Sequence, residues 1–373
     1  MSQNPVAPPF RADHVGSFLR PTALLEAREK HAAGEMDADG LREAEDVAIA
    51  EIVRLQEDVG LRSITDGEFR RNAFHTDFLR HLDGVAITRA PKLQITKSDG
   101  GQSFAPPVIT VVDKVSHGHD VERANFEYLQ SVTGQTPKVT IPSPTMLHFR
   151  GGREAISSEI YPDLEEFYAD VAAAYASELQ SLGEAGCTYV QMDDTNLAYL
   201  CDTTQREKAR ERGLDPDQLP RDYARFINMA IADRPEGMVT AVHLCRGNFR
   251  SSWAAEGGYE PVAEVLFNEL AIDAYFLEYD DARSGDFAPL RFVPKNKTVV
   301  LGLVTTKFDT MEDRDAILRR IEEAAKYLPV EQMCLSPQCG FSSTVKGNDI
   351  AVESQAAKLR LVVEVAREVW GTN

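Results

Sequence analysis

The sequence lacks several features that define whole classes of protein. No apolar run approaches the roughly 20 residues needed to span a bilayer, and the start of the chain has neither the basic nor the apolar region of a signal peptide. Basic residues are outnumbered: 40 Lys and Arg stand against 59 Asp and Glu, which gives a net charge of -19. We therefore expect a cytoplasmic protein with no membrane partner and no nucleic-acid partner, because anionic partners require a concentrated basic face.

Cysteine is also scarce, with five residues in 373. An odd number of cysteines in a long chain without an export signal predicts reduced thiols and no disulfide frame. Cys187, Cys201 and Cys334 are expected to be small buried core residues. Cys339 lies beyond Pro337 and before Gly340, where a core residue is less expected, and Cys245 ends an apolar run, so both remain candidates for metal binding.

Short apolar runs alternate with helical patterns along the chain. This alternation predicts a (β/α)8 TIM barrel that forms a single domain over residues 1–373. A region rich in β-like runs, residues 82–137, is expected to be a β-hairpin-type insertion between the second and third strands. An open doubly wound sheet is the alternative, but the sequence contains neither a G-x-G-x-x-G segment after the first strand nor a Walker motif. The eight expected barrel strands are residues 11–16, 61–65, 138–141, 188–192, 238–244, 274–278, 298–304 and 332–336.

Four metal-ligand side chains follow the ends of three of these strands. His243 and Cys245 point to the same face because alternate residues of a strand do so. Glu278 ends the next strand, and Cys339 follows the last one. One nitrogen, two sulfurs and one oxygen form a ligand set that suits Zn²⁺. A lone His-x-Cys pair could equally be part of a core, so the prediction depends on all four converging.

Three more polar residues follow strand ends and could bind a small substrate. Glu68 and Asp193 are either ordinary helix-entry carboxylates or a pair that holds an ammonium group. Ser17, after Gly16, could offer its hydroxyl and nearby N–H groups to a carboxylate. A metal, a cation site and an anion site at one barrel mouth suit an amino acid that carries a thiol.

Six segments together resemble a known family. They are residues 13–21, 65–71, 190–194, 243–250, 276–281 and 335–341. Over nearly its whole length the chain is similar to the C-terminal catalytic barrel of cobalamin-independent methionine synthase, and more so to the short single-barrel bacterial relatives of that enzyme. The resemblance implies Zn²⁺ as cofactor, held by His243, Cys245, Glu278 and Cys339. It further implies that Val15, Ser17, Glu68 and Asp193 bind homocysteine.

The implied reaction is transfer of a methyl group to the homocysteine sulfur. Four protein ligands would close the zinc shell, so we expect Glu278, the hardest ligand, to give way to the substrate sulfur. The methyl donor of the full-length enzymes is a methyl-folate, but their second, N-terminal barrel and their indole near the pterin are missing here, where His148 and Phe149 stand instead. Their proton-donating histidine aligns near Lys307, which is either a catalytic proton donor or a solvated lysine.

Three functions remain open from the sequence. The first is a homocysteine methyltransferase that uses methyl-tetrahydrofolate or another donor, such as a corrinoid or a second protein. The second is zinc-dependent alkyl transfer to another thiol, as in epoxyalkane:coenzyme M transferases; Glu68 and Asp193 favour an amino-acid acceptor over coenzyme M, which has no amine. The third is a zinc or thiol-binding protein without turnover. The sequence leaves a homo-oligomer open.

Overall fold

The computed structural model describes residues 8–89, 107–248 and 251–373. The strands are β1 Ser63–Ile64, β2 Asp83–Arg89, β3 Pro107–Ser116, β4 Thr136–Pro137, β5 Val139–Pro142, β6 Tyr189–Asp194, β7 Val239–Leu244, β8 Ala274–Glu278, β9 Thr298–Val304 and β10 Met333–Pro337. The α-helices are α1 Thr22–Ala32, α2 Ala38–Val59, α3 Thr76–Leu79, α4 Arg123–Val132, α5 Met146–Phe149, α6 Leu164–Glu184, α7 Asn196–Tyr199, α8 Thr203–Glu211, α9 Leu219–Ile231, α10 Glu260–Asn268, α11 Arg314–Ala324 and α12 Val352–Trp370. Short 3-10 helices are η1 Gly152–Ala155, η2 Ala282–Ser284, η3 Ala288–Phe292 and η4 Val330–Gln332.

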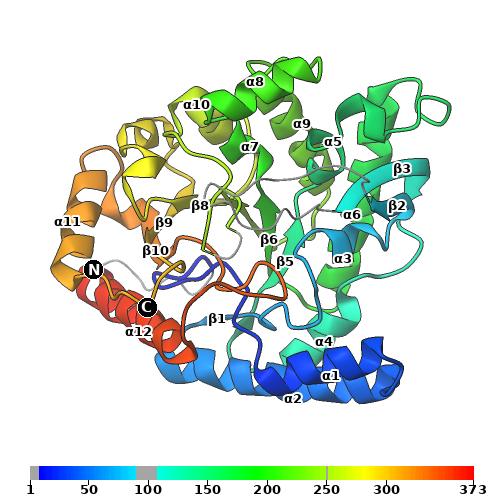
Figure 1. Ribbon diagram of the computed structural model, residues 1–373. Helices are drawn as coiled ribbons and strands as arrows, with labels where there is room; N and C mark the ends of the chain where they lie inside the picture. The colour runs from blue at the N-terminus through cyan, green and yellow to red at the C-terminus, as the bar shows by residue number, and fades with distance from the viewer. Residues whose placement is uncertain (1–7, 90–106, 249–250) are drawn as a thin grey trace.

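A parallel sheet forms the centre of the α/β fold. Its order is β10-β9-β8-β7-β6-β5, so strands that follow one another along the chain are neighbours in space. Beyond β5, the short strand β1 pairs in parallel with β4. Beyond β10, an isolated parallel bridge joins Ala12 to Leu335. Figure 1 shows the strands in the middle of the molecule and the longer helices around them.

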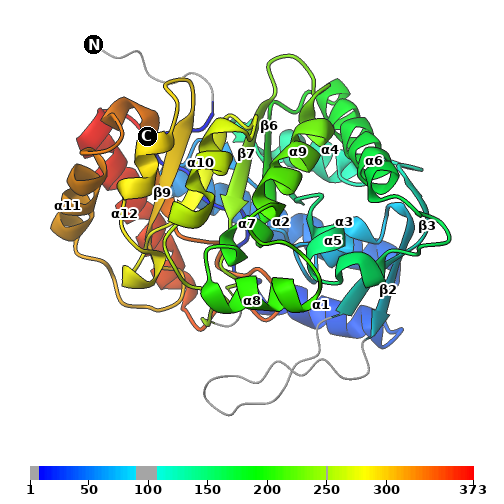
Figure 2. The ribbon, with the colours of Figure 1, turned by 90° about the horizontal axis from the view of Figure 1, so that it is seen from above.

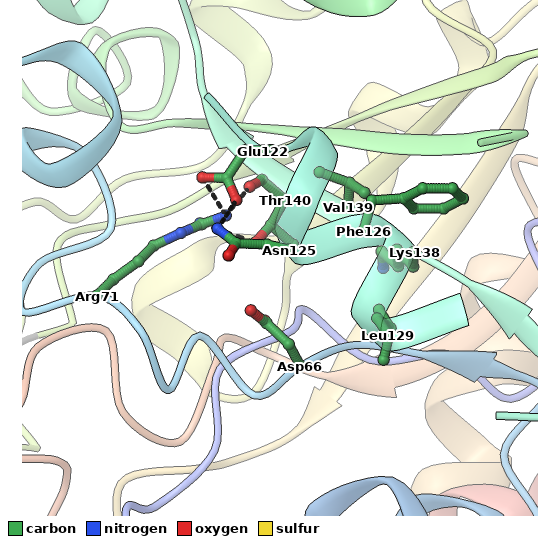
Figure 3. Close-up of a pocket in the computed structure, with 9 residues that line it drawn as sticks. All are labelled: Asp66, Arg71, Glu122, Asn125, Phe126, Leu129, Lys138, Val139 and Thr140. Atoms are coloured by element: carbon green, nitrogen blue, oxygen red, sulfur yellow. Dashed lines mark hydrogen bonds and ion pairs between the residues drawn. The ribbon is translucent and has the colours of Figure 1, made fainter. Parts of the chain in front are cut away.

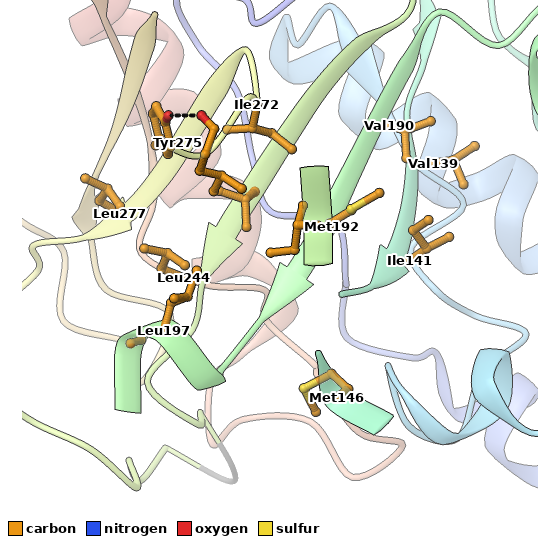
Figure 4. Close-up of a cluster of buried hydrophobic side chains, with 14 of the residues drawn as sticks. Val139, Ile141, Met146, Val190, Met192, Leu197, Leu244, Ile272, Tyr275 and Leu277 are labelled. Atoms are coloured by element: carbon orange, nitrogen blue, oxygen red, sulfur yellow. Dashed lines mark hydrogen bonds between the residues drawn. The ribbon is translucent and has the colours of Figure 1, made fainter. Parts of the chain in front are cut away.

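Both faces of the sheet are buried, which explains the nearly continuous apolar runs of the strands. One face packs against the helices, and Figure 4 shows part of this layer, including Met192 on β6, Leu244 on β7 and Leu277 on β8. The other face forms a separate cluster of Val15, Tyr189, Ala241, Ala274, Phe276, Val300 and Cys334. Because side chains alternate along a strand, the residues that follow this second set in phase are Asp193, His243 and Glu278. The polar site therefore begins where the second cluster ends.

The helices begin and end at residues whose side chains or backbone favour these positions. The Asp37 side chain accepts a hydrogen bond from the Gly40 N–H at the start of α2, and the Asp163 side chain accepts one from the Glu165 N–H at the start of α6. Gly60 ends α2 with φ of 97°, a left-handed conformation that favours glycine. None of the helices in the described ranges is both long and apolar enough to cross a membrane.

The first two predicted barrel strands are shorter than expected. Residues 11–16 contribute only the bridge at Ala12, and residues 61–65 contribute only Ser63 and Ile64. Gly16 has φ of 134°, which lies outside the strand region, and the N–H of His14 bonds to the Asp13 carboxylate instead of to a neighbouring strand. The other six predicted strands are present, with ends that differ by one or two residues. The charged loop before α9 contains α7 and α8, which the sequence did not predict.

The predicted insertion, which lies between β1 and β5 in the chain, contains an antiparallel pair of strands. Strands β2 and β3 pair with one register shift between Asp83 and Val85. Both ribbon views place this pair on the side of the molecule away from α11 and α12 (Figures 1 and 2). Helix α4 follows the pair. Another β-like run of this region, residues 92–96, lies outside the described residues.

Candidate metal and thiol site

The four predicted metal ligands converge at the carboxyl ends of the strands. One donor atom each from His243, Cys245, Glu278 and Cys339 lies within 4.8 Å of every other. The two sulfur atoms are 3.5 Å apart, and all four residues are buried. Two strands and two strand-end loops, separated by almost a hundred residues, thus contribute to one cluster.

The register of the sheet places these side chains together. His243 pairs with Phe276 across β7 and β8, which leaves Glu278 two residues further along on the same face. Glu278 in turn pairs with Gly302 of β9. A side-chain carbon at Gly302 would lie 2.7 Å from Gln338 Cα, so only glycine allows the end of β10 to approach this closely. The register of β10 shifts between Ser336 and Pro337, and the chain then turns to present Cys339.

Several buried polar atoms of the cluster have no hydrogen-bond partner among the described residues. They are both ring nitrogens of His243 and Oε2 of Glu278. The other oxygen, Oε1, accepts a hydrogen bond from the Arg246 N–H at 2.8 Å. Unpaired buried polar atoms are costly, so their gathering around one point indicates that something else satisfies them.

The charges of the cluster point to a cation. The hydrogen bond with Cys339 holds the pKa of the Cys245 thiol well below its ordinary value, which favours a thiolate. Burial, and next the charge on Cys245, raises the pKa of Glu278 to about 7. Two like charges compete in a dry site, and a divalent cation between them would remove the conflict. The donor set and the unpaired atoms therefore fit a zinc ion held by His243, Cys245, Glu278 and Cys339.

The predicted substrate residues lie beside this cluster. Gln191 Nε2 donates to the Val15 carbonyl and to Asp193 Oδ1, both at 2.7 Å, and Asp193 is the cross-strand neighbour of His243. A methyl group added at Gly340, next to Cys339, would lie 1.9 Å from Ser17 Oγ. Val15, Ser17 and Asp193 are thus joined to the same strand ends as the metal ligands.

Glu68 and Asp193 both have raised pKa values. Burial, and next the charge on Glu68, raises the pKa of Asp193 to about 7. Burial also raises the pKa of Glu68. A side-chain carbon at Gly16 would lie 3.4 Å from Glu68 Oε1, which places Glu68 against the segment that carries Val15 and Ser17. Two buried carboxylates whose pKa values are both raised suit an ammonium ligand, which would stabilise both in the charged form.

Lys307 is buried and forms an ion pair of 2.6 Å with Asp280, so the solvated alternative is wrong. Asp280 also contacts Arg283 at 3.2 Å, and Arg283 lies 3.9 Å from Glu278 Oε2. This chain of ion pairs ends at the metal cluster. The sequence reasoning missed Asp280 and Arg283 as site residues, although Asp280 lies in one of the segments that carry the family resemblance.

The remaining polar candidates have hydrogen-bond partners within the protein, although the buried Nε2 of His148 has none among the described residues. His148, which replaces an expected aromatic, bonds through Nδ1 to the Tyr223 hydroxyl at 2.9 Å, and burial lowers its pKa to about 4. A second group of His117, Asp120 and Glu178 also has metal-ligand geometry. Its Glu178 carboxylate already accepts hydrogen bonds from His117 and two backbone N–H groups, which indicates a structural role. Cys187, Cys201 and Cys334 are free and buried, as predicted.

Comparison with known proteins assigns the family. The profile described as "Cobalamin-independent synthase, Catalytic domain" matches residues 10–368. The uncharacterized protein YxjH of Bacillus subtilis is 46% identical over 367 residues, which cover 97% of this chain and 95% of that relative. A Listeria monocytogenes crystal structure, provisionally assigned as a vitamin-B12 independent methionine synthase, is 38% identical with a TM-score of 0.78, and the match covers 98% of this chain and 99% of that one.

A more distant structure shares the fold. It is a B12-independent methionine synthase from Shewanella sp. W3-18-1 in complex with selenomethionine, 20% identical, with a TM-score of 0.70 over 96% of this chain and 97% of that one. The predicted family is thereby confirmed. The chain belongs to the cobalamin-independent methionine synthase family and contains its catalytic domain.

Proposed function

We propose that the protein is a zinc-dependent methyltransferase that transfers a methyl group to the thiol of homocysteine and so forms methionine. The observation that carries this proposal is the meeting of His243, Cys245, Glu278 and Cys339 within 4.8 Å, with unpaired buried atoms among them. Membership of the methionine synthase family supports the same reaction. The neighbouring cradle of Val15, Ser17, Glu68 and Asp193 supports an amino acid as the thiol substrate.

Each group of residues has a separate task in this proposal. Zinc, when bound, would keep the substrate sulfur as a thiolate at neutral pH, where a free thiol of pKa about 8.5 is mostly protonated. Glu68 and Asp193 would hold the ammonium group, and Ser17 with nearby backbone N–H groups would hold the carboxylate. Lys307 remains a candidate proton donor to the leaving group, and its ion pair with Asp280 would hold its amine at the site.

We also propose that the sheet closes into a (β/α)8 barrel, with residues 82–137 inserted into one domain. Support comes from contacts that join residues 13–18, next to the segment bridged to β10, with residues 63–67 at and after β1. Ser63 Oγ donates to Asp13 Oδ1 at 2.7 Å, Thr65 Oγ1 donates to the Gly16 carbonyl at 2.6 Å, and the Phe18 N–H donates to the Gly67 carbonyl at 3.1 Å. These bonds run between β1 and the segment bridged to β10. A closed barrel would make the second apolar cluster its interior and the metal cluster its mouth.

Incubation of zinc-loaded protein with homocysteine and a panel of methyl donors would test the function, with methionine followed by mass spectrometry. We expect methionine from at least one donor among methyl-tetrahydrofolate, a methyl-corrinoid and simple methyl compounds. Cys245→Ser and Cys339→Ser should lose zinc and activity together. If the protein alkylates coenzyme M and not homocysteine, the result would favour the alternative function, zinc-dependent alkyl transfer to a thiol other than homocysteine. Protein that retains no zinc after metal loading would contradict the proposal.

A further inference from the structure

The backbone of Glu68 is held in a conformation that non-glycine residues rarely adopt. Its φ is 59°, and strain of this kind persists only where the surroundings fix it. The Glu68 N–H donates to Asp66 Oδ1 at 2.8 Å, while its carbonyl accepts from Arg20 Nη2 at 2.8 Å and from the Arg71 N–H at 3.1 Å. These three hydrogen bonds fix the backbone of Glu68 and therefore the direction in which its side chain extends.

The side chain of Glu68 is held by Thr140 on β5. Thr140 Oγ1 lies 3.1 Å from Glu68 Oε1 and 3.1 Å from Arg71 Nη1. A guanidinium can only donate, so the Thr140 oxygen accepts from Arg71 and its single proton is left for Glu68. The direction of both hydrogen bonds is therefore determined, and the hydroxyl has no free choice of partner.

Arg71 is itself anchored from outside the sheet. Its Nη2 lies 3.2 Å from Glu122 Oε1, and Glu122 Oε2 accepts from Asn125 Nδ2 at 2.9 Å. Glu122 and Asn125 belong to the region after the β2–β3 pair, at the start of α4. Figure 3 shows the Arg71 guanidinium pointing toward Glu122 and Thr140, with Asn125 beside it. All three members of this row, Glu122, Arg71 and Thr140, are buried.

We propose that Arg71 and Thr140 are positioning residues that aim the Glu68 carboxylate at the amino group of the thiol substrate, and that Glu122 holds Arg71 for this purpose. The inference rests on the proposed function, in which Glu68 binds that amino group. It assigns a part in substrate selection to the inserted segment, whose residue Glu122 contacts Arg71. The row of Glu122, Arg71 and Thr140 is expected to add no binding affinity for a thiol that lacks the amino group.

The test compares homocysteine with 4-mercaptobutanoate, which has the same thiol and carboxylate but no amine. Dissociation constants of both ligands are measured by calorimetry on zinc-loaded protein, and zinc content is measured alongside. Thr140→Val removes the hydroxyl at nearly constant volume. We expect this variant to lose about tenfold of the preference for homocysteine, as the loss of one hydrogen bond to a charged group predicts. Binding of 4-mercaptobutanoate and zinc content should stay unchanged.

Two further variants separate positioning from a general structural effect. Thr140→Ser keeps the hydroxyl and should restore the preference. Thr240→Val is a matched control. Thr240 is also a buried strand threonine, and its hydroxyl donates to the Asp273 carboxylate at 3.0 Å. It lies near the start of β7, at the end of the strand opposite to His243. This control variant should leave the preference unchanged. If Thr140→Val does not fold, Arg71→Lys serves in its place, since one ammonium cannot reproduce both contacts of the guanidinium.

The outcomes distinguish this inference from the proposed function. An unchanged preference in Thr140→Val, or an equal loss of affinity for both ligands, would overturn the positioning role. A wild-type protein that binds 4-mercaptobutanoate as tightly as homocysteine would instead overturn the amino-acid substrate. Glu122→Gln, which weakens the anchor of Arg71, should lose part of the preference and lie between wild type and Thr140→Val.

Discussion

Glu278 differs from the other three proposed metal ligands because a cation lies within reach of its carboxylate. Its Oε2 is 3.9 Å from Arg283 Nη2, and Arg283 is held in turn by Asp280 at 3.2 Å. Its Oε1 keeps a hydrogen bond from the Arg246 N–H. When substrate sulfur binds the metal, the Glu278 carboxylate can therefore pair with Arg283 and the Arg246 N–H instead. Neither cysteine thiolate has such an alternative arginine partner among the described residues. The hard oxygen donor is also the weakest match to zinc in this set.

At the residue scale we therefore predict that Glu278→Gln keeps most of its zinc but changes thiol binding. A neutral amide competes less well than a carboxylate for the metal, so homocysteine should bind about tenfold more tightly while methyl transfer slows. Metal analysis and calorimetry would measure the two effects, with the exposed Glu264→Gln as control. Unchanged thiol affinity and turnover would reject the idea that Glu278 yields its place.

The ends of β8, β9 and β10 form one element-scale unit that spaces Glu278 from Cys339. Gly302 lies between them, paired with Glu278 on one side and packed against the Gln338 backbone on the other. The bonds from the Tyr279 N–H to the Gly302 carbonyl and from the Gln338 N–H to the Val304 carbonyl continue the pairing past the strand ends. The distance between two of the proposed metal ligands thus depends on a residue that contributes no side chain.

At the element scale we predict that Gly302→Ala disturbs the metal site without touching a ligand. The added carbon would lie 2.7 Å from Gln338 Cα and 2.8 Å from the Leu277 carbonyl oxygen, and backbone cannot move aside as a flexible side chain does. We expect lower zinc affinity and a loss of about 1–3 kcal/mol in the free energy of unfolding. Gly134→Ala is the matched control, since nothing lies within 4 Å of its added carbon. Wild-type zinc affinity in Gly302→Ala, measured by chelator competition, would contradict this account.

A buried ion pair joins the first segment of the chain to the residue that precedes β5. Lys138, between β4 and β5, lies 3.2 Å from Asp13 Oδ1, and neither side chain is exposed. Asp13 also accepts hydrogen bonds from Ser63 Oγ at 2.7 Å and Tyr189 Oη at 2.9 Å. One carboxylate therefore links the first segment of the chain to β1, β5 and β6.

At the scale of the whole molecule we predict that Lys138→Met costs about 3–5 kcal/mol of folding free energy, because it leaves the Asp13 charge buried without a cation. Urea unfolding would measure this cost. The double variant Asp13→Asn with Lys138→Met should recover most of the stability, since it removes both charges. A double variant no more stable than the single one would show that packing, and not the uncompensated charge, accounts for the loss.

Much of this arrangement could be predicted from the sequence. Six of the eight expected strands are present in order, and the side chains of His243, Cys245, Glu278 and Cys339 converge as expected. The lengths of the first two strands were overestimated. In residues 11–16, the His14 N–H bonds to the Asp13 side chain instead of to a neighbouring strand, and Gly16 has a positive φ that ends the extended conformation. Lys307 remained ambiguous because its partner Asp280 is 27 positions away and nothing in the sequence pairs them.

The sequence by itself determined which side chains stand at strand ends, since alternation and apolar runs are local properties of the chain. It also determined the ligand types, and hence the class of metal that suits them. Only the tertiary structure decided that Glu68 is held through Thr140 by Arg71, and that Glu122 of the inserted segment holds Arg71 in turn. Such contacts depend on how distant segments pack against the sheet, and local sequence patterns carry no record of that packing.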